Sequence, residues 1–435
     1  MKHVKLVFFV FFIFGFTVNA QDYTSFFTGD LEDVETNKTQ GYCLMGGATE
    51  NDDAMRWFLN LADGGDVLVL RASGGDGYNN YFYEDLEVSI NSVETIVLHN
   101  SNVGSNAYIL QQIQNAEAIW FAGGDQWDYV SYLKNTPLHD ALNEHILIKN
   151  APIGGTSAGM AILGAYYFDA QYGTITSDQA LANPFREELS LGYNDFLQIP
   201  TLSQVITDTH FDDPDRRGRL ISFLARVQDF EGTNEVMGIA CDEFTSVGID
   251  ENGQAIVFGG YPAYDDFAYF VKINCIPNNV PSQFTPEQSL NWNNDAGAIK
   301  AFRVGGTSEG NSAMNINTNE FFDEHGQWFD WNVNEANFTS TLGTDYECDL
   351  NTLENRKATL VIYPNPTQKE LYLNSTTNSI KGVDVFNTLG KNQASFRFSP
   401  LESARISLES FSEGVYILQV HFENGKTQLV KLLKN

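Results

Sequence analysis

The sequence has few basic residues, few cysteines and few long apolar runs, and each shortage argues against a class of protein. Lysine and arginine number 25 against 56 aspartates and glutamates, which gives a formal net charge of −31. Nucleic-acid-binding proteins need a basic face, so the charge argues against a nucleic-acid partner and equally against an anionic membrane surface. The acidity is compatible with a cationic substrate, although it is also an ordinary means by which a secreted protein stays soluble.

The four cysteines do not have the spacing of a zinc site. Cys43 and Cys241 lie in strand-like runs, where we expect them to be small buried hydrophobic residues. Cys275 and Cys348 bracket an irregular segment and form the better candidate disulfide pair, since exported proteins can hold disulfides.

The longest apolar run lies at residues 6–18, behind Lys2 and Lys5 and ahead of a small-residue cleavage pattern at residues 18–20. A run this short and this close to the N-terminus is typical of a secretory signal peptide. We therefore expect residues 1–20 to be a signal peptide, and no later stretch is long and apolar enough to be a transmembrane segment. The 435 residues, 43% of them hydrophobic, are enough for two or three globular domains.

Short apolar strands alternate with helical segments from residue 41 onward. Strands are predicted at residues 42–45, 66–71, 95–99 and 118–121, and helices at residues 53–62, 107–115, 127–135 and 138–149. This alternation predicts an α/β fold with a mostly parallel sheet flanked by helices. Sites in such sheets collect at the carboxyl ends of strands, where glycine pairs stand at residues 46–47, 74–75 and 123–124. Residues 22–40 are polar and are expected to form an exposed lead-in, and residues 275–348 show no clear pattern.

Residues 155–159 read Gly-Thr-Ser-Ala-Gly, which has the G-x-S-x-G form of a nucleophile elbow. Such an elbow places its serine, here Ser157, on a strained strand-to-helix turn. Gly155 and Gly159 let neighbouring backbone approach, and the amide of Ala158 can point at a developing oxyanion. The pattern predicts that Ser157 is a catalytic nucleophile.

A serine nucleophile needs a base, and the base needs an acid that holds its tautomer. His210 is the best candidate base because it ends a strand-like run at residues 205–211, whereas His139 and His145 lie on a predicted helix where a solvated face is expected. Asp242 and Glu243 close a predicted strand at residues 236–241, and either could supply the acid. Asp208 would share a face with His210 if that run is extended.

Four motifs in order resemble the cyanophycinase and dipeptidase E family of serine peptidases, which has the class I glutamine-amidotransferase-like fold. They lie at residues 123–126, 155–159, 208–220 and 242–243. The resemblance covers about residues 40–345 and implies that Ser157 is the nucleophile, His210 the base and Glu243 the acid. It further implies an oxyanion hole formed by the amides of Gly124 and Ala158, and it implies no metal or cofactor.

The same resemblance implies a substrate of the cyanophycin kind, which is a poly-aspartate carrying arginine on each side chain, cleaved to β-Asp-Arg dipeptides. The residues it assigns to substrate binding are Gln126, Asp208, Thr209, Arg216, Arg217 and Arg219. The fork of an arginine suits a carboxylate, and a carboxylate suits a substrate guanidinium. Thr209 departs from the family, which has glutamine there, so the substrate could instead be another aspartyl or isoaspartyl peptide.

The last part of the chain changes to short strands separated by glycine turns, which predicts a small β-sandwich. Residues 359–435 resemble the C-terminal sorting domain of the type IX secretion system, carried by a Tyr-Pro-Asn-Pro-Thr stretch at residues 363–367 and by Gly-Val-Tyr at residues 414–416. The alternative is a carbohydrate- or surface-binding sandwich. We expect a signal peptide at 1–20, a peptidase domain at 21–348, a linker at 349–358 and the sorting domain at 359–435.

The predicted protein is thus secreted or displayed on the outer cell surface, with an aspartyl-peptide substrate and the type IX machinery as partners, and it is compatible with a homodimer. An α/β-hydrolase esterase is a second reading, in which Asp195 or Asp208 would be the acid, but the HGGG-type loop it needs is absent. An amidotransferase would need cysteine at position 157. A non-catalytic surface-binding module that keeps the fold is the remaining alternative.

Overall fold

The computed structural model describes residues 21–346, 360–375, 378–387, 391–423 and 427–435. The predicted signal peptide, the predicted linker and Cys348 lie outside these residues. Cys275 is disulfide-bonded, whereas Cys43 and Cys241 are free and buried, as their strand-like surroundings predicted. No described helix has the length and apolar character needed to cross a membrane.

The first of two large sheets has ten strands and carries a parallel centre. Its order is β1(Tyr23–Gly29), β4(Ser92–Leu98), β3(Asp66–Arg71), β5(Ala118–Phe121), β6(Ile153–Thr156), β2(Gly41–Met45), β11(Ser246–Asp250), β12(Gln254–Phe258), β15(Asn311–Asn315) and β16(Glu320–Phe321). The strands from β4 to β2 are parallel, and the pairs outside them are antiparallel. The α/β class is confirmed, but the whole sheet is mixed because hairpins extend one edge and β1 adds to the other.

The expected exposed lead-in is therefore wrong over β1, which pairs along its whole length with β4. Its alternation of threonine, serine and phenylalanine suits an edge strand with one covered face. The four helices predicted in this half are present as α1(Asp52–Asn60), α3(Ala107–Asn115), α4(Gln126–Leu133) and α5(Pro137–Leu147).

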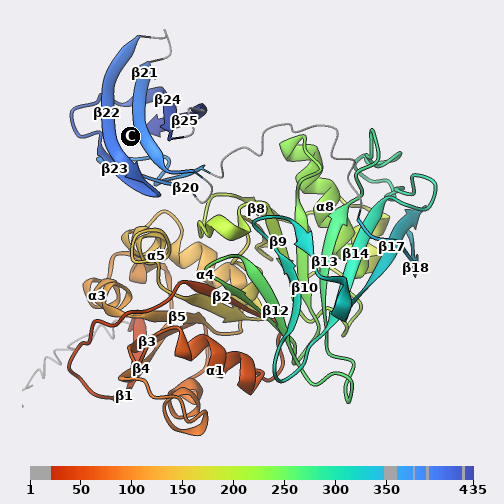
Figure 1. Cartoon of the computed structure of the whole chain (residues 1–435), viewed down its shortest axis with the longest axis horizontal. Helices are drawn as coiled ribbons and strands as arrows, with labels where there is room; N and C mark the ends of the chain where they lie inside the picture. Colours follow the sequence, from red (N-terminus) through yellow and green to blue (C-terminus); the bar gives the residue numbers. More distant parts are fainter. Residues whose placement is uncertain (1–20, 347–359, 376–377, 388–390, 424–426) are drawn as a thin grey trace, which may run out of the picture.

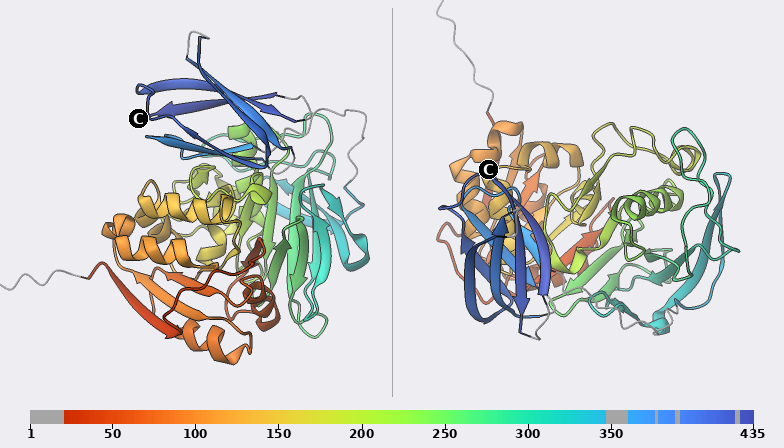
Figure 2. Two further views of the ribbon diagram at one scale, coloured as in Figure 1. Left: turned by 60° about the vertical axis from the view of Figure 1, so that its left-hand side comes forward. Right: turned by 90° about the horizontal axis from the view of Figure 1, so that it is seen from above.

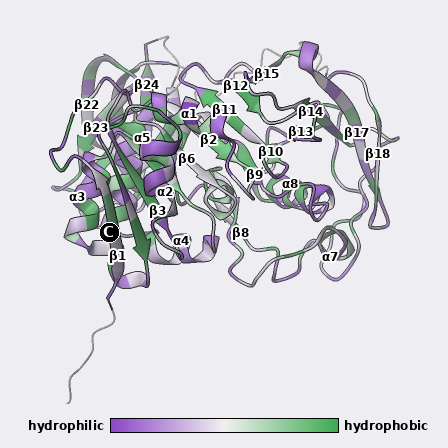
Figure 3. Cartoon of the chain, turned by 90° about the horizontal axis from the view of Figure 1, so that it is seen from below, coloured by the Kyte–Doolittle hydropathy of each residue, from purple (hydrophilic) through white to green (hydrophobic). Residues whose placement is uncertain are grey.

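These helices cover the two faces of the first sheet (Figure 1). Along β3, Val67 and Val69 point into the apolar cluster that contains α1, whereas Leu68 and Leu70 point into the cluster that contains α3 and α5. Successive side chains of a strand face opposite sides, so an unbroken apolar run is what a sheet covered on both faces requires. Figure 3 shows the hydrophobic residues concentrated on the strands between the helices.

The second large sheet has eight strands and was not predicted. Its order is β18(Asn337–Leu342), β17(Gly326–Asn334), β14(Ile299–Gly305), β13(Phe267–Ile273), β10(Met237–Cys241), β9(Val205–Asp208), β7(Tyr166–Phe168) and β8(Leu191–Tyr193). Met237 and Ile239 on one face of β10 join the core shared with the first sheet, and Ala240 on the other face joins a cluster under α8(Arg217–Glu231). The stretch 275–348, which showed no clear pattern, thus supplies the antiparallel strands β14, β17 and β18 to this sheet, and β15 and β16 to the first sheet.

The remaining helical segments are short. They are α2(Gly77–Asn80), α6(Ala158–Ala161) and α7(Ser177–Ala182), a π-helix at Tyr81–Asp85, and 3₁₀ turns at Ser101–Ser105, Pro200–Leu202 and Asp323–His325. Two of them, α2 and α6, follow strands of the first sheet and lie at its carboxyl edge.

The C-terminal strands form two further antiparallel sheets, which confirms the predicted small β-sandwich. One sheet has the order β19(Leu360–Tyr363), β20(Glu370–Ser375), β23(Ser403–Ser407), and the other β22(Asn392–Leu401), β21(Ile380–Asn387), β24(Gly414–Phe422), β25(Thr427–Lys434). Leu371 of the first and Val383 and Val420 of the second meet in one core. The left view in Figure 2 shows these strands as a distinct body above the two large sheets.

Candidate active site

Ser157 lies where β6 of the first sheet meets α6, in a strained backbone conformation. Its φ of 52° and ψ of −115° fall outside the regions that residues with a side chain normally adopt. The turn closes tightly, because a methyl group added to Gly155 would lie 2.6 Å from the carbonyl carbon of Gly159, and one added to Gly159 would overlap the carbonyl of Phe121. The two glycines therefore permit the close backbone approach that the sequence pattern predicted.

His210 and Glu243 reach Ser157 from the second sheet, where they follow the neighbouring parallel strands β9 and β10. The His210 Nε2 atom is 2.7 Å from the Ser157 Oγ atom, and the His210 Nδ1 atom is 2.6 Å from a carboxylate oxygen of Glu243. A continuous chain of hydrogen bonds thus joins carboxylate, imidazole and hydroxyl. This is the arrangement by which a histidine takes a proton from a serine while the acid holds its tautomer.

Two glycines at the end of β2 hold this arrangement together across the two sheets. The backbone amide of His210 donates to the carbonyl of Gly46 at 2.9 Å, and the amide of Phe244 donates to the carbonyl of Gly47 at 3.1 Å. Gly47 has a φ of +130°, and a methyl group there would overlap the His210 ring. The ring therefore occupies space that only glycine leaves open.

The two predicted oxyanion donors lie beside the serine. Ala158 is the first residue of α6, and Gly123, which precedes Gly124, comes within 3.6 Å of the Ser157 Cβ atom when a methyl group is built on it. Within the described residues, neither the Gly124 amide nor the Ala158 amide donates a hydrogen bond. Both amides are therefore unengaged and can act as donors.

Ser157 and His210 open into a cavity of about 570 Å³. The other lining residues lie at the ends of β3 and β6 or in the segments that follow β2, β3 and β5. They are Ala48, Thr49, Glu50, Arg71, Gly77, Tyr78, Tyr81, Gly123 and Thr156. Of these, Glu50, Arg71, Tyr78 and Tyr81 were not predicted to belong to the site. Arg71 ends a predicted strand just before a glycine pair, which is the one signal that could have indicated it.

The predicted substrate-binding residues do not line this cavity. Asp208 and Arg219 are buried and form an ion pair in which Arg219 Nε donates to an Asp208 oxygen at 3.0 Å. Each charge is neutralised by the other. Breaking a buried pair is costly, because it leaves an uncompensated charge in the core. In this structure they are therefore paired with each other beneath the His210 strand, and their contact with substrate stays a prediction.

The other four predicted contacts are also engaged elsewhere. Thr209 is buried, and its carbonyl accepts a hydrogen bond from the Arg216 guanidinium at 2.8 Å. Arg217 pairs with Asp215 and stacks on Phe338. Gln126 begins α4 and its side-chain amide is 3.4 Å from the Phe168 carbonyl. The motif marks the region of the site, but its polar side chains hold loops and helix starts rather than lining the cavity.

Neither acid of the esterase reading approaches His210. Asp195 pairs with Lys134 at 2.7 Å and accepts a hydrogen bond from the Tyr167 hydroxyl at 2.7 Å, and Asp208 is paired as described. The two helix histidines were also misjudged: His145 is buried and bonded to the Pro152 carbonyl, and burial lowers its pKa to about 3. Both His139 and His145 anchor α5 to neighbouring loops.

Asp242 was the alternative acid, and the structure turns it away from His210. One of its oxygens accepts from the Phe267 amide at 3.3 Å, and the other is buried without a partner in the described residues. Burial, with Asp212 adding repulsion, raises its pKa to about 8. Asp242 is therefore predominantly protonated at neutral pH and packs behind Glu243.

Replacing Asp242 by asparagine should remove a pH-dependent loss of stability. The folded form binds the Asp242 proton up to about pH 8, whereas the unfolded chain releases it near 3.8, the ordinary pKa of an aspartate, so the free energy of unfolding falls as pH rises between these values. The melting temperature of Asp242→Asn should match wild type at about pH 3.8 and below, and exceed it increasingly as the pH rises towards 8. A difference between the two proteins that does not change with pH would contradict this account.

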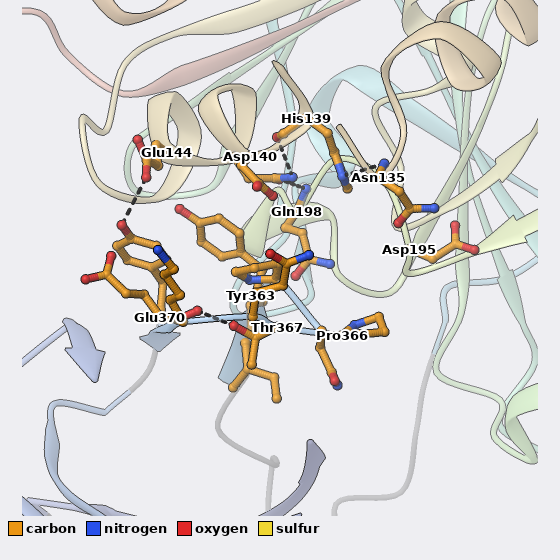
Figure 4. Close-up of a pocket in the computed structure, with 18 of the residues that line it drawn as sticks. Asn135, His139, Asp140, Glu144, Asp195, Gln198, Tyr363, Pro366, Thr367 and Glu370 are labelled. Atoms are coloured by element: carbon orange, nitrogen blue, oxygen red, sulfur yellow. Dashed lines mark hydrogen bonds between the residues drawn. The ribbon is translucent and has the colours of Figure 1, made fainter. Parts of the chain in front are cut away.

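A larger hollow of about 1120 Å³ lies between α5 and the strands β19 and β20 and contains none of the triad residues (Figure 4). There the Tyr372 hydroxyl donates to Glu144 at 3.0 Å, and the Asn374 amide donates to the Leu147 carbonyl at 3.3 Å. The hollow therefore lies along the contact between the C-terminal strands and α5.

Within the described residues, no three histidine, cysteine, aspartate or glutamate side chains gather closely enough to hold a metal ion.

Comparison with known families agrees with this geometry. Residues 71–252 match the model of Peptidase family S51. The chain resembles the S51 peptidases. Residues 361–435 match the secretion system C-terminal sorting domain. The predicted resemblance to a peptidase with a sorting domain is thereby confirmed, and the sorting domain indicates a secreted protein.

Individual relatives of the S51 region include three cyanophycinases. That of Geminocystis herdmanii (strain PCC 6308) is 24% identical over 213 residues, covering 46% of this chain and 71% of the relative. That of Trichormus variabilis (strain ATCC 29413 / PCC 7937) is 24% identical and that of Synechococcus elongatus 26%, over 40% and 41% of this chain. The chain spans 52% and 50% of these last two relatives, about half of their length.

Two solved structures are also similar to part of this chain. A peptidase from an acI-B1 Actinobacterium gives a TM-score of 0.36 at 14% identity, covering 51% of this chain and 88% of that chain. A putative peptidase E protein from Listeria monocytogenes EGD-e gives a TM-score of 0.33 at 16% identity, covering 51% and 99%.

Proposed function

We propose that this chain is a secreted serine peptidase in which Ser157, His210 and Glu243 act as nucleophile, base and orienting acid. The observation that carries the proposal is the unbroken series of hydrogen bonds from Glu243 through His210 to Ser157 at the mouth of a cavity. A strained serine between two glycines, with a histidine on one side and free amides on the other, meets the geometric requirements of acyl transfer.

In the proposed reaction the Ser157 Oγ atom attacks the peptide carbonyl carbon while its proton passes to His210 Nε2. The negative charge that develops on the carbonyl oxygen is stabilised by the amides of Gly124 and Ala158. His210 then gives the proton to the leaving amine, and the acyl group stays on Ser157. A water molecule, deprotonated by His210, attacks this ester and releases the acid, which returns Ser157 to its starting state.

The substrate we propose first is cyanophycin, with other aspartyl or isoaspartyl peptides as the alternative. Support comes from the cyanophycinase relatives of the S51 region and from an open cavity large enough for an extended peptide substituent. The residues assigned to carboxylate binding by resemblance are engaged elsewhere, so this chain would recognise such a substrate through a different set of side chains.

Export completes the proposal. We assign residues 1–20 to a signal peptide, 21–348 to the peptidase domain, 349–358 to a linker and 359–435 to the sorting domain recognised by the type IX machinery. The match of residues 361–435 to a secretion sorting domain supports this division. The peptidase would act at the cell surface or in the medium.

The test is incubation of the purified protein with insoluble cyanophycin beside the Ser157→Ala variant, followed by mass spectrometry of the soluble fraction. Release of Asp-Arg dipeptides by wild type alone would support both reaction and substrate. Release of none, with cleavage of α- or β-linked aspartyl peptides, would support the alternative substrates. No cleavage of any of them would favour a non-catalytic module that keeps the fold.

A further inference from the structure

Arg71 is the one arginine or lysine among the described residues that line the Ser157 cavity. It ends β3, and the structure fixes its guanidinium on two backbone carbonyls. Arg71 Nε donates to the Ser73 carbonyl at 2.9 Å, and Nη1 donates to the Gly75 carbonyl at 3.2 Å. The guanidinium carbon also lies 5.3 Å from the centre of the Tyr78 ring. These contacts hold the side chain in one orientation without using up its charge.

The loop that holds Arg71 depends on glycine. Gly74 has a φ of +99°, and a methyl group there would stand 2.5 Å from Arg71 Nη2. The loop therefore closes around the guanidinium in a way that a larger residue would prevent.

The positive charge of Arg71 has no acidic partner within ion-pair distance in the described part of the chain. Glu50, the acid that lines the same cavity, accepts the Tyr78 hydroxyl instead, and burial raises its pKa despite Arg71 nearby. The guanidinium keeps three N–H donors without a partner in the described residues, and a planar fork of this kind matches a carboxylate.

The Arg71 loop also lies beside the reacting atoms. A methyl group built on Gly124, the proposed oxyanion donor, would lie 3.5 Å from the Ala72 Cβ atom and 3.6 Å from the Ser73 Oγ atom. One built on Gly123 would lie 3.6 Å from the Ser157 Cβ atom. A carboxylate on Arg71 and a carbonyl on Ser157 can therefore belong to one small substrate.

We propose that Arg71 forms a carboxylate subsite in the Ser157 cavity, so that the preferred peptides carry a free carboxylate close to the bond that is cleaved. The inference rests on the proposed function and narrows its substrate class. It assigns carboxylate recognition to Arg71, which the family resemblance did not indicate, instead of to the arginines at residues 216–219. The carboxylate can come from an aspartyl side chain or from the free α-carboxylate of an isoaspartyl residue.

The test measures equilibrium binding in the Ser157→Ala background, where no peptide is consumed. Two matched pairs of capped tripeptides serve as probes. One compares aspartate with asparagine at the central residue, and the other compares isoaspartate with its α-amide. We expect one carboxylate probe to bind about 10- to 100-fold more tightly than its amide partner, as for a lost charged hydrogen bond. Adding Arg71→Gln should abolish that preference, and Arg71→Lys should keep part of it.

Arg226→Gln provides the matched control. Arg226 also donates to a backbone carbonyl, at 3.0 Å, and stacks on an aromatic ring, at 4.9 Å, but it does not line the cavity. This control should keep the full preference. A preference that survives Arg71→Gln, or no preference in the parent protein, would overturn the subsite. Because binding is measured without turnover, that result is separate from the cyanophycin experiment, which tests the peptidase itself.

Discussion

Ser157→Ala should lower the rate of peptide hydrolysis by at least about 10³-fold while leaving the melting temperature close to that of wild type. In the proposed mechanism the Ser157 hydroxyl supplies the nucleophile, so its loss removes the covalent route. Its hydrogen bond in the structure is to His210 alone, at the surface of the cavity, so its removal leaves the packing of β6 unchanged. Steady-state kinetics and thermal unfolding of the same preparation check both halves of the expectation.

His210→Ala provides the companion measurement, because residues that act as a unit have strongly non-additive effects. The double variant should be no less active than the poorer of the two single variants. If the fold losses of the two single variants multiplied in the double variant, or if hydrolysis continued in Ser157→Ala, Ser157 and His210 would not form one catalytic unit. A large fall in melting temperature for Ser157→Ala would instead indicate a structural role for the serine.

Gly47→Ala should cost at least about 100-fold in activity, because a displacement of the base by about 1 Å is enough for such a loss. The added methyl group would overlap the His210 ring, which must then move away from Ser157. The φ of +130° is also strained for alanine, so the free energy of unfolding should fall by about 1–3 kcal/mol. Rates of hydrolysis and chemical denaturation measure the two effects.

Gly173→Ala is the control that separates the steric overlap with the His210 ring from the strain of a positive φ. Gly173 also has a positive φ, +91°, but nothing lies within 4 Å of an added methyl group. This variant should lose some stability and keep its activity. If Gly47→Ala lost no more activity than Gly173→Ala, the ring of His210 would not depend on the space that Gly47 leaves.

The parts of the site that could be predicted are those whose chemistry needs a fixed local pattern. The elbow at residues 155–159 requires glycine on both sides of Ser157, and the structure shows why: neither position has room for a methyl group. The helices at residues 107–115 and 126–133 were visible because their apolar spacing matches one face of a helix, with Asn106 and Asp125 capping their first turns.

The parts that were missed depend on partners far apart in the chain. Glu50 and Arg71 enter the cavity because β2 and β3 end at the same edge of the sheet, and a polar residue at a strand end looks alike whether it faces a cavity or bulk water. Asp208 and Arg219 show the opposite case. Their charges suggested ligand binding, but the packing of α8 on β9 pairs them with each other in the core.

The sequence by itself determined the α/β class, the strained serine and the change to an all-β C-terminal part, because each follows from local periodicity or from the steric demands of a short motif. The tertiary structure decided which acid faces His210 and which arginine enters the Ser157 cavity. It also decided that two sheets, rather than one, meet at the site. Each of these depends on which strand ends lie side by side, and that is fixed by long-range packing and by burial of charge rather than by neighbours in the chain.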